Sequence, residues 1–146
     1  MTSAARPEVV IAETLRWVGT PYRHQGSRRG VGCDCLGLVR GVWRAVVGPE
    51  PETAPAYAAA WNDASRDETL LDAAARRLLP TDSCDPGAIL VFRWRAGATA
   101  RHCGVLVAPD RLAHAYSGHG VVVSPFGRAW RSRVAGQFLF PSPSAE

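Results

Sequence analysis

The spacing of apolar residues predicts helices in the first half of the chain. Residues 7–18 begin at a proline, which suits the first turn of a helix, and share one apolar face formed by Ile11, Leu15 and Val18. A second helix is predicted to begin near Cys35 and to stop at Gly48–Pro49. Its buried face is expected to contain Leu36, Val39, Trp43 and Val46 or Val47.

Two glycines, Gly37 and Gly41, lie four residues apart inside the second predicted helix. Glycine is a poor helix former, so this spacing predicts close packing against a neighbouring segment. Residues 57–79 are rich in alanine and are expected to be helical, in two pieces that end at Pro80. Their expected core residues are Leu70, Leu71, Ala74 and Leu78.

The second half of the chain changes to a strand pattern. Runs of β-branched and aromatic residues bounded by turn residues predict strands at 88–92, 103–107, 112–116, 121–123 and 137–140. Helices followed by strands predict an α+β fold with helices packed on an antiparallel sheet. We expect one domain, residues 1–141, and a frayed tail over residues 142–146.

Composition narrows the class of protein. The 146 residues are 47% apolar and 21% charged, which excludes wholesale disorder. No apolar run approaches the ~20 residues that cross a bilayer, so we expect no membrane span. All 17 basic residues are arginines against 13 acidic residues, a net charge of +4. This excess is consistent with ordinary surface ion pairs or with mild attraction to an anionic polymer such as DNA, anionic lipid or bacterial cell wall.

Four cysteines are too few, in a chain of this length, to form a disulfide framework. The first eight residues lack the basic start and apolar stretch of a secretory signal. We therefore expect the protein to be made and left in a cytoplasm unless a route other than general secretion delivers it.

Cys35 is the strongest candidate for chemistry, because it follows a Gly-rich loop and opens a helix. A helix N-terminus stabilises a thiolate, and its free amides can bind an oxyanion. His102 and His114 flank a predicted hairpin and could supply the base. An odd-length loop centred near Ala108 would place both histidines on one face, whereas a two-residue loop would place them on opposite faces.

Two other interpretations use the same residues. A buried cysteine is usually a small apolar residue, and a histidine on a strand is usually structural. A zinc site could instead combine Cys33, Cys35, His102 and His114, although Cys-x-Cys is closer than the usual ligand spacing. We therefore predict no metal and no cofactor.

Four short segments occur in a characteristic order: residues 19–22 with the loop leading to 33–39, then 86–92, 101–106 and 112–115. Together they resemble the NlpC-type cell-wall cysteine peptidases and cover most of residues 7–125. The resemblance implies a reduced papain-like fold, with the nucleophile at a helix N-terminus and the helices on a five- to six-stranded antiparallel sheet. It also implies hydrolysis of amide bonds in peptidoglycan stem peptides, typically next to D-glutamate.

The resemblance assigns roles to individual residues. It implies that Cys35 is the nucleophile, that His102 is the base and that His114 orients the base. Tyr22 is expected to help place the substrate or the oxyanion, and the Cys35 amide is the expected oxyanion donor. Asp34 and His24 are grouped with Tyr22 as candidate substrate or oxyanion residues.

Three positions depart from the family pattern. Leu36 lies where many members have serine, and Cys33 and Cys103 lie where apolar residues are common. The extra thiols favour oxidative disulfide formation with Cys35 and a loss of activity.

Residues 20–26 and the segment from Trp130 to Pro141 resemble the compact branch found in tails of phages and gene transfer agents. This resemblance implies a peptidase that assembles with tail tip, hub or baseplate proteins in the producing bacterium. It would then open the recipient's wall in the periplasm for DNA delivery, without binding a nucleic acid sequence itself. The alternatives are a structural tail component with a vestigial site, a peptidoglycan amidase or an acyl transferase.

Overall fold

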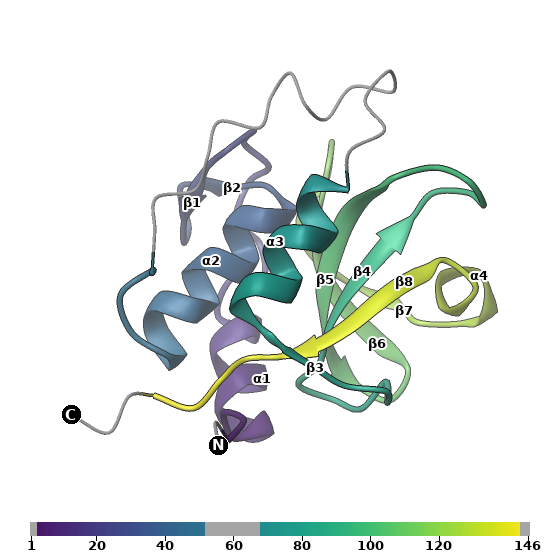
Figure 1. The fold of residues 1–146 in the computed structure, drawn as a ribbon. Coiled ribbons are helices and arrows are strands. Elements are labelled where there is room, and N and C mark those ends of the chain that lie inside the picture. Colours follow the sequence, from purple (N-terminus) through teal and green to yellow (C-terminus); the bar gives the residue numbers. More distant parts are fainter. Residues whose placement is uncertain (1–2, 52–67, 144–146) are drawn as a thin grey trace.

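The computed structural model describes residues 3–51 and 68–143 and has the α+β architecture that the sequence predicts (Figure 1). Of the helical segment predicted over residues 57–79, the part up to residue 67 therefore lies outside the described residues. The first half of the chain forms α1 (Pro7–Leu15), β1 (Ser27–Arg28), β2 (Gly32–Cys33), α2 (Cys35–Val46) and α3 (Thr69–Arg77). The second half forms β3 (Leu79–Pro80), β4 (Ile89–Arg93), β5 (Ala100–Ala108), β6 (Arg111–Tyr116), β7 (Gly120–Pro125), α4 (Arg128–Arg131) and β8 (Val134–Leu139).

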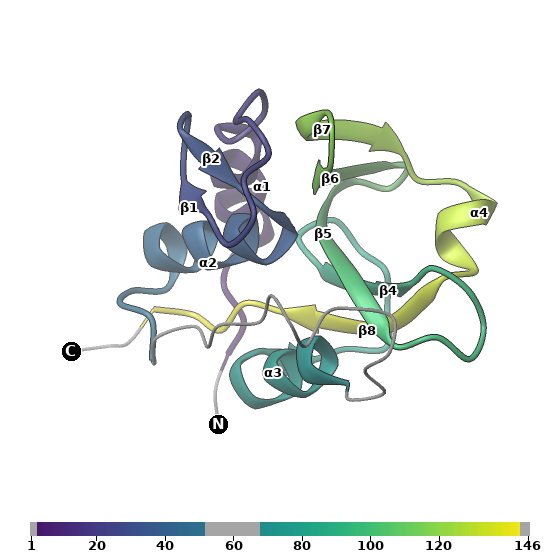
Figure 2. The same ribbon diagram turned by 90° about the horizontal axis from the view of Figure 1, so that it is seen from above.

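The main sheet has six antiparallel strands in the order β3-β8-β4-β5-β6-β7. Each of the five predicted strands is present, and the short β3 adds the edge beside β8. Figures 1 and 2 show α1 and α2 on one side of the curved sheet and α4 on the other. One apolar core joins the three long helices to the sheet, and a second core packs beneath α4.

The orientation of α1 differs from the prediction. Leu15 and Val18 are exposed, and the buried positions are instead Val10, Thr14 and Trp17. These residues also have helical spacing, but the polar Thr14 conceals the pattern in the sequence. Thr14 is buried without penalty because its hydroxyl donates to the Val10 carbonyl oxygen at 2.7 Å.

The two glycines of α2 confirm the predicted close packing. A Cβ atom on Gly37 would lie 1.7 Å from the Gly26 carbonyl oxygen, and one on Gly41 would lie 2.0 Å from the Trp17 ring. Any larger residue would push α2 away from α1 or from the loop that precedes it. These contacts fix the first turn of α2, where Cys35 lies, against its surroundings.

Strands β5 and β6 separate at one end. Their ladder runs from Val105, opposite Ala113, to the turn at residues 109–110. From Gly104 back to Ala100, β5 pairs with β4, while β6 continues beside β7 as far as Tyr116. The separation creates a place where side chains from β5, β6 and the start of α2 can meet.

Candidate active site

Asp34 determines where α2 begins. Its side chain accepts the Gly37 N–H at 2.8 Å, which caps the helix, and its second oxygen accepts the Gln25 N–H at 2.7 Å. Because it accepts a hydrogen bond from each segment, the buried carboxylate joins the preceding loop to the first turn of α2. His24 has an exposed ring whose Nδ1 lies 3.9 Å from the same carboxylate. This geometry gives Asp34 a structural function at the helix start.

The two histidines meet because of a bulge. The turn at residues 109–110 has two residues, which alone would place the histidines on opposite faces. The register shifts between Leu106 and Ala108, which brings both rings to one face. His102 Nε2 lies 2.7 Å from His114 Nδ1, and both rings are buried.

Gly104 makes room for this pair. A Cβ atom there would lie 3.0 Å from the Cβ of His114 and 2.7 Å from the Ala113 carbonyl oxygen. A side chain at this position would therefore displace β6 from β5 beside the histidines.

Ser124 on β7 extends the histidine pair. Its Oγ lies 2.9 Å from His114 Nε2, so the hydrogen-bonded chain runs His102–His114–Ser124. The sequence analysis did not identify Ser124, since a serine at the end of a strand has no distinguishing local pattern. The strand register supplies the missing information, because it aligns Ser124 with Leu112 next to His114.

The electrostatics of His114 determine how this chain is protonated. Burial, followed by the charge of His102, lowers the pKa of His114 to about 4. His114 is therefore neutral near neutral pH and has one donor and one acceptor nitrogen. Neutral His114 can therefore accept a hydrogen bond from His102 Nε2 at its Nδ1 and donate one from Nε2 to Ser124 Oγ. The hydrogen bond to His114 fixes the orientation of the His102 ring.

The thiol of Cys35 lies beside β5, with its Sγ 4.0 Å from the Arg101 carbonyl oxygen. A hydrogen bond from the Cys103 thiol, followed by interactions with His102, lowers the pKa of Cys35 to about 5, although burial acts in the opposite direction. Cys35 is therefore a thiolate near neutral pH, which is the nucleophilic form of cysteine. The pKa of Cys103 is raised well above its usual value, so Cys103 remains a thiol donor.

Tyr22 and Cys33, two candidate residues near this thiol, differ in exposure and in the chemistry they can supply. Burial, followed by the nearby charges of Cys35 and Asp34, raises the pKa of Tyr22, so its hydroxyl stays protonated and can donate a hydrogen bond. The ring is 37% exposed and forms part of the surface beside the nucleophile. Cys33, which pairs through its backbone with Tyr22, is fully buried, and burial raises its pKa to about 12.

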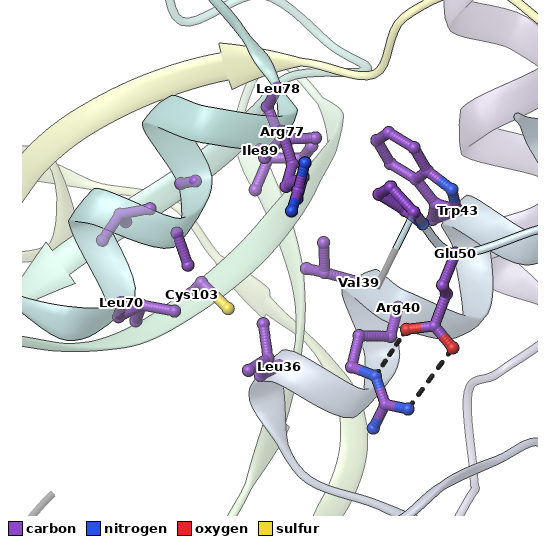
Figure 3. Close-up of a pocket in the computed structure, with 14 residues that line it drawn as sticks. Leu36, Val39, Arg40, Trp43, Glu50, Leu70, Arg77, Leu78, Ile89 and Cys103 are labelled. Atoms are coloured by element: carbon purple, nitrogen blue, oxygen red, sulfur yellow. Dashed lines mark hydrogen bonds and ion pairs between the residues drawn. The ribbon is translucent and has the colours of Figure 1, made fainter. Parts of the chain in front are cut away.

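An apolar cavity of about 110 Å³ lies behind the nucleophile, between α2, α3 and the sheet. Figure 3 shows the Cys103 sulfur pointing toward Leu36 at one end of the cavity and the Arg40–Glu50 ion pair at the other. Leu70 of α3 and Leu78, the residue after α3, close it on the remaining side. Cys35, His102 and His114 do not line this cavity, whereas Cys103, the hydrogen-bond donor to Cys35, does.

Within residues 3–51 and 68–143, no group of three or more His, Cys, Asp and Glu side chains is arranged to hold a metal ion. None of the four cysteines forms a disulfide. The same part of the chain contains no helix long and apolar enough to span a membrane.

The fold and the thiol–imidazole arrangement define a papain-like α+β domain with a Cys–His site. The chain belongs to the NlpC/P60 family, whose model matches residues 19–138. It is 28% identical over 118 residues to the Escherichia coli protein named murein DD-endopeptidase MepS/murein LD-carboxypeptidase, an alignment that covers 80% of this chain and 54% of that protein. The chain thus spans about half the length of the curated relatives that it matches.

Solved structures agree on the fold. The NlpC/p60 domain of the peptidoglycan hydrolase SagA superposes with a TM-score of 0.61 at 19% identity, covering 91% of this chain and 97% of that one. NlpC2 from Trichomonas vaginalis gives 0.66 at 16% identity, covering 97% and 50% respectively. An NlpC/P60 family protein from Bacillus cereus gives 0.64 at 15% identity, covering 93% and 40%.

Proposed function

We propose that this chain is a cysteine endopeptidase that hydrolyses amide bonds in peptidoglycan stem peptides. The observation that carries the proposal is the Cys35 thiol, which interacts with His102 at the end of the hydrogen-bonded His102–His114–Ser124 chain. Membership of the NlpC/P60 family and similarity to a murein endopeptidase support peptidoglycan as the substrate class.

The mechanism follows from the site. The Cys35 thiolate attacks the peptide carbonyl carbon, and the carbonyl π electrons move to oxygen, which becomes an oxyanion. The first N–H groups of a helix lack intrahelical partners, so the Cys35 amide is placed to bind that oxyanion. Protonated His102 gives its proton to the departing amine, which leaves a thioester on Cys35. Neutral His102 then takes a proton from water, whose hydroxide attacks the thioester and releases the acid and the thiolate.

Digestion of purified peptidoglycan tests this proposal. The wild-type protein is compared with Cys35→Ala. Cys84→Ser serves as a matched control, because the Cys84 thiol donates a hydrogen bond to Gln137 and has no part in the proposed site. We expect soluble muropeptides from wild type and from Cys84→Ser, and none from folded Cys35→Ala. Mass spectrometry of the products identifies the cleaved bond and separates an endopeptidase from an amidase. Equal digestion by Cys35→Ala would refute cysteine catalysis.

The biological setting is part of the proposal. We infer a tail-associated enzyme of a phage or gene transfer agent, made in a bacterial cytoplasm and acting in the recipient's periplasm. The support is the resemblance of residues 20–26 and 130–141 to that branch. Proteomics of purified particles from the producing strain tests it, and absence of the protein from particles that contain other tail proteins would refute it. Infective particles assembled with Cys35→Ala would favour the structural alternative.

A further inference from the structure

Aromatic rings enclose the imidazole of His102. The indole of Trp94 stacks on it, with ring centroids 5.1 Å apart and planes inclined by 25°. Trp130 lies 5.8 Å away at 32°, on α4, and Phe92 lies 6.0 Å away at 31°. Tyr116 approaches edge-on at 6.3 Å. None of these rings has a role in the proposed reaction.

Trp94 reaches His102 because the surrounding backbone directs it there. Phe92 pairs with His102 in the sheet, and Trp94 directly follows the last residue of β4, from where its indole stacks on the imidazole. Arg93 between them is fixed, because its N–H donates to the Arg133 carbonyl oxygen at 2.8 Å and its guanidinium binds Glu68 and the Ala98 carbonyl. Trp94 as a residue is nevertheless 40% exposed, so it forms part of the outer surface over the imidazole.

We propose that Trp94 is a positioning residue for His102: its indole holds the imidazole between Cys35 and His114 and stabilises the protonated ring through its π face. The inference rests on the proposed function, in which protonated His102 accompanies the Cys35 thiolate. A cation over an aromatic face is attracted by the ring quadrupole, most strongly for Trp. Trp130, at 5.9 Å from Trp94, supports the indole from the side of α4.

Apart from Cys35, the charged and titratable groups around His102 do not stabilise its protonated ring. The aromatic rings supply that stabilisation. Cys35 of α2 supplies a negative thiolate, and His114 of β6 is neutral because burial lowers its pKa. The Tyr116 ring of β6 lies 6.3 Å from the imidazole with its plane inclined by 81°, so the two rings do not stack. The Arg133 guanidinium lies 5.9 Å from the Trp130 ring and adds a like charge on that side. Removing the Trp94 face therefore weakens the thiolate–imidazolium pair.

The test measures how fast iodoacetamide alkylates Cys35 as a function of pH, with peptide mass spectrometry to separate the four thiols. Trp94→Ala, Trp94→Leu and Trp94→Phe are compared, together with Trp43→Phe, which alters an indole that contacts Phe140 rather than His102. We expect Trp94→Ala and Trp94→Leu to slow Cys35 alkylation at about pH 6 by about tenfold and to move the rise in rate to higher pH. Trp94→Phe keeps a π face and should lose less than about threefold. Trp43→Phe should match wild type.

The leucine and phenylalanine variants separate the π face from simple packing, since both keep an apolar side chain over the ring. The inference is overturned if folded Trp94→Leu alkylates Cys35 with the wild-type pH dependence, or if Trp94→Phe and Trp94→Leu behave alike. Alkylation needs no peptidoglycan. A protein that fails to digest cell wall but shows the expected Trp94 effect would refute the proposed substrate and leave the positioning function intact.

Discussion

Strand β2 and the first turn of α2 each hold a buried cysteine, two residues apart, with opposite properties. Burial raises the pKa of Cys33 to about 12. At Cys35 the burial effect is outweighed by the Cys103 thiol and by His102, which lower the pKa to about 5. Asp34 lies between them and its charge acts on both thiols in the same direction. The difference therefore comes from what each sulfur faces across the fold.

The comparison shows that reactivity here belongs to a position in the tertiary structure. Cys33 lies in a two-residue strand and packs into the core with no exposed surface. Cys35 lies at a helix start opposite β5, where it meets donors that arrive from about 70 residues later in the chain. A thiolate needs such donors to compensate for lost hydration.

Selective alkylation of the two cysteines is the test of this comparison with the largest expected effect. At about pH 6 the thiolate fraction of Cys35 exceeds that of Cys33 by about a millionfold, and the weaker nucleophilicity of a low-pKa thiolate returns about a thousandfold. We therefore expect Cys35 to react with iodoacetamide about a thousand times faster than Cys33. The Cys35 rate should rise as pH increases through about 5 and then level off, because deprotonation is complete above its pKa. Comparable rates at both sites would contradict the assignment.

The next test is a substitution that displaces the first turn of α2. Gly37→Ala places a Cβ atom against the Gly26 carbonyl oxygen, and neither backbone can yield without shifting the helix start. We expect a loss of about 3 kcal/mol in the free energy of unfolding, measured by urea denaturation, together with a lower preference for Cys35 alkylation. Gly127→Ala is the control, because a Cβ there meets no atom within 4 Å. If both variants lose the same stability, close packing at Gly37 is not what fixes the site.

The sequence predicted the elements of this site better than their contacts. Cys35 at a helix start and the strand that carries His114 follow from local patterns, and the structure has both. The strand predicted over residues 103–107 began one residue after His102, which the structure places inside β5. The face of the histidines depended on a bulge near Val107. That shift is visible only in the strand pairing, where the register of Leu106 with Leu112 changes by one residue at Ala108 and Arg111.

Other features required the tertiary structure. The buried face of α1 was predicted incorrectly because Thr14 is polar, and its hydroxyl is satisfied within the helix. Ser124 and Trp94 have unremarkable local contexts and become part of the site only through tertiary contacts with the two histidines. The short β1–β2 hairpin was expected to be a loop, since strands of two residues leave no alternating pattern.

The smallest expected effect concerns Cys103, the donor that distinguishes the surroundings of Cys35 from those of Cys33. Cys103→Val removes this donor at a buried position of similar volume, so the pKa of Cys35 should rise and its alkylation at about pH 5 should fall several-fold. Cys103→Ser retains a donor and should preserve most of the low pKa. Because Cys103 does not contribute to the pKa shift of Cys33, the alkylation rate of Cys33 serves as the internal control. Identical pH profiles for the Val and Ser variants would show that His102 and the helix start are sufficient to hold the thiolate.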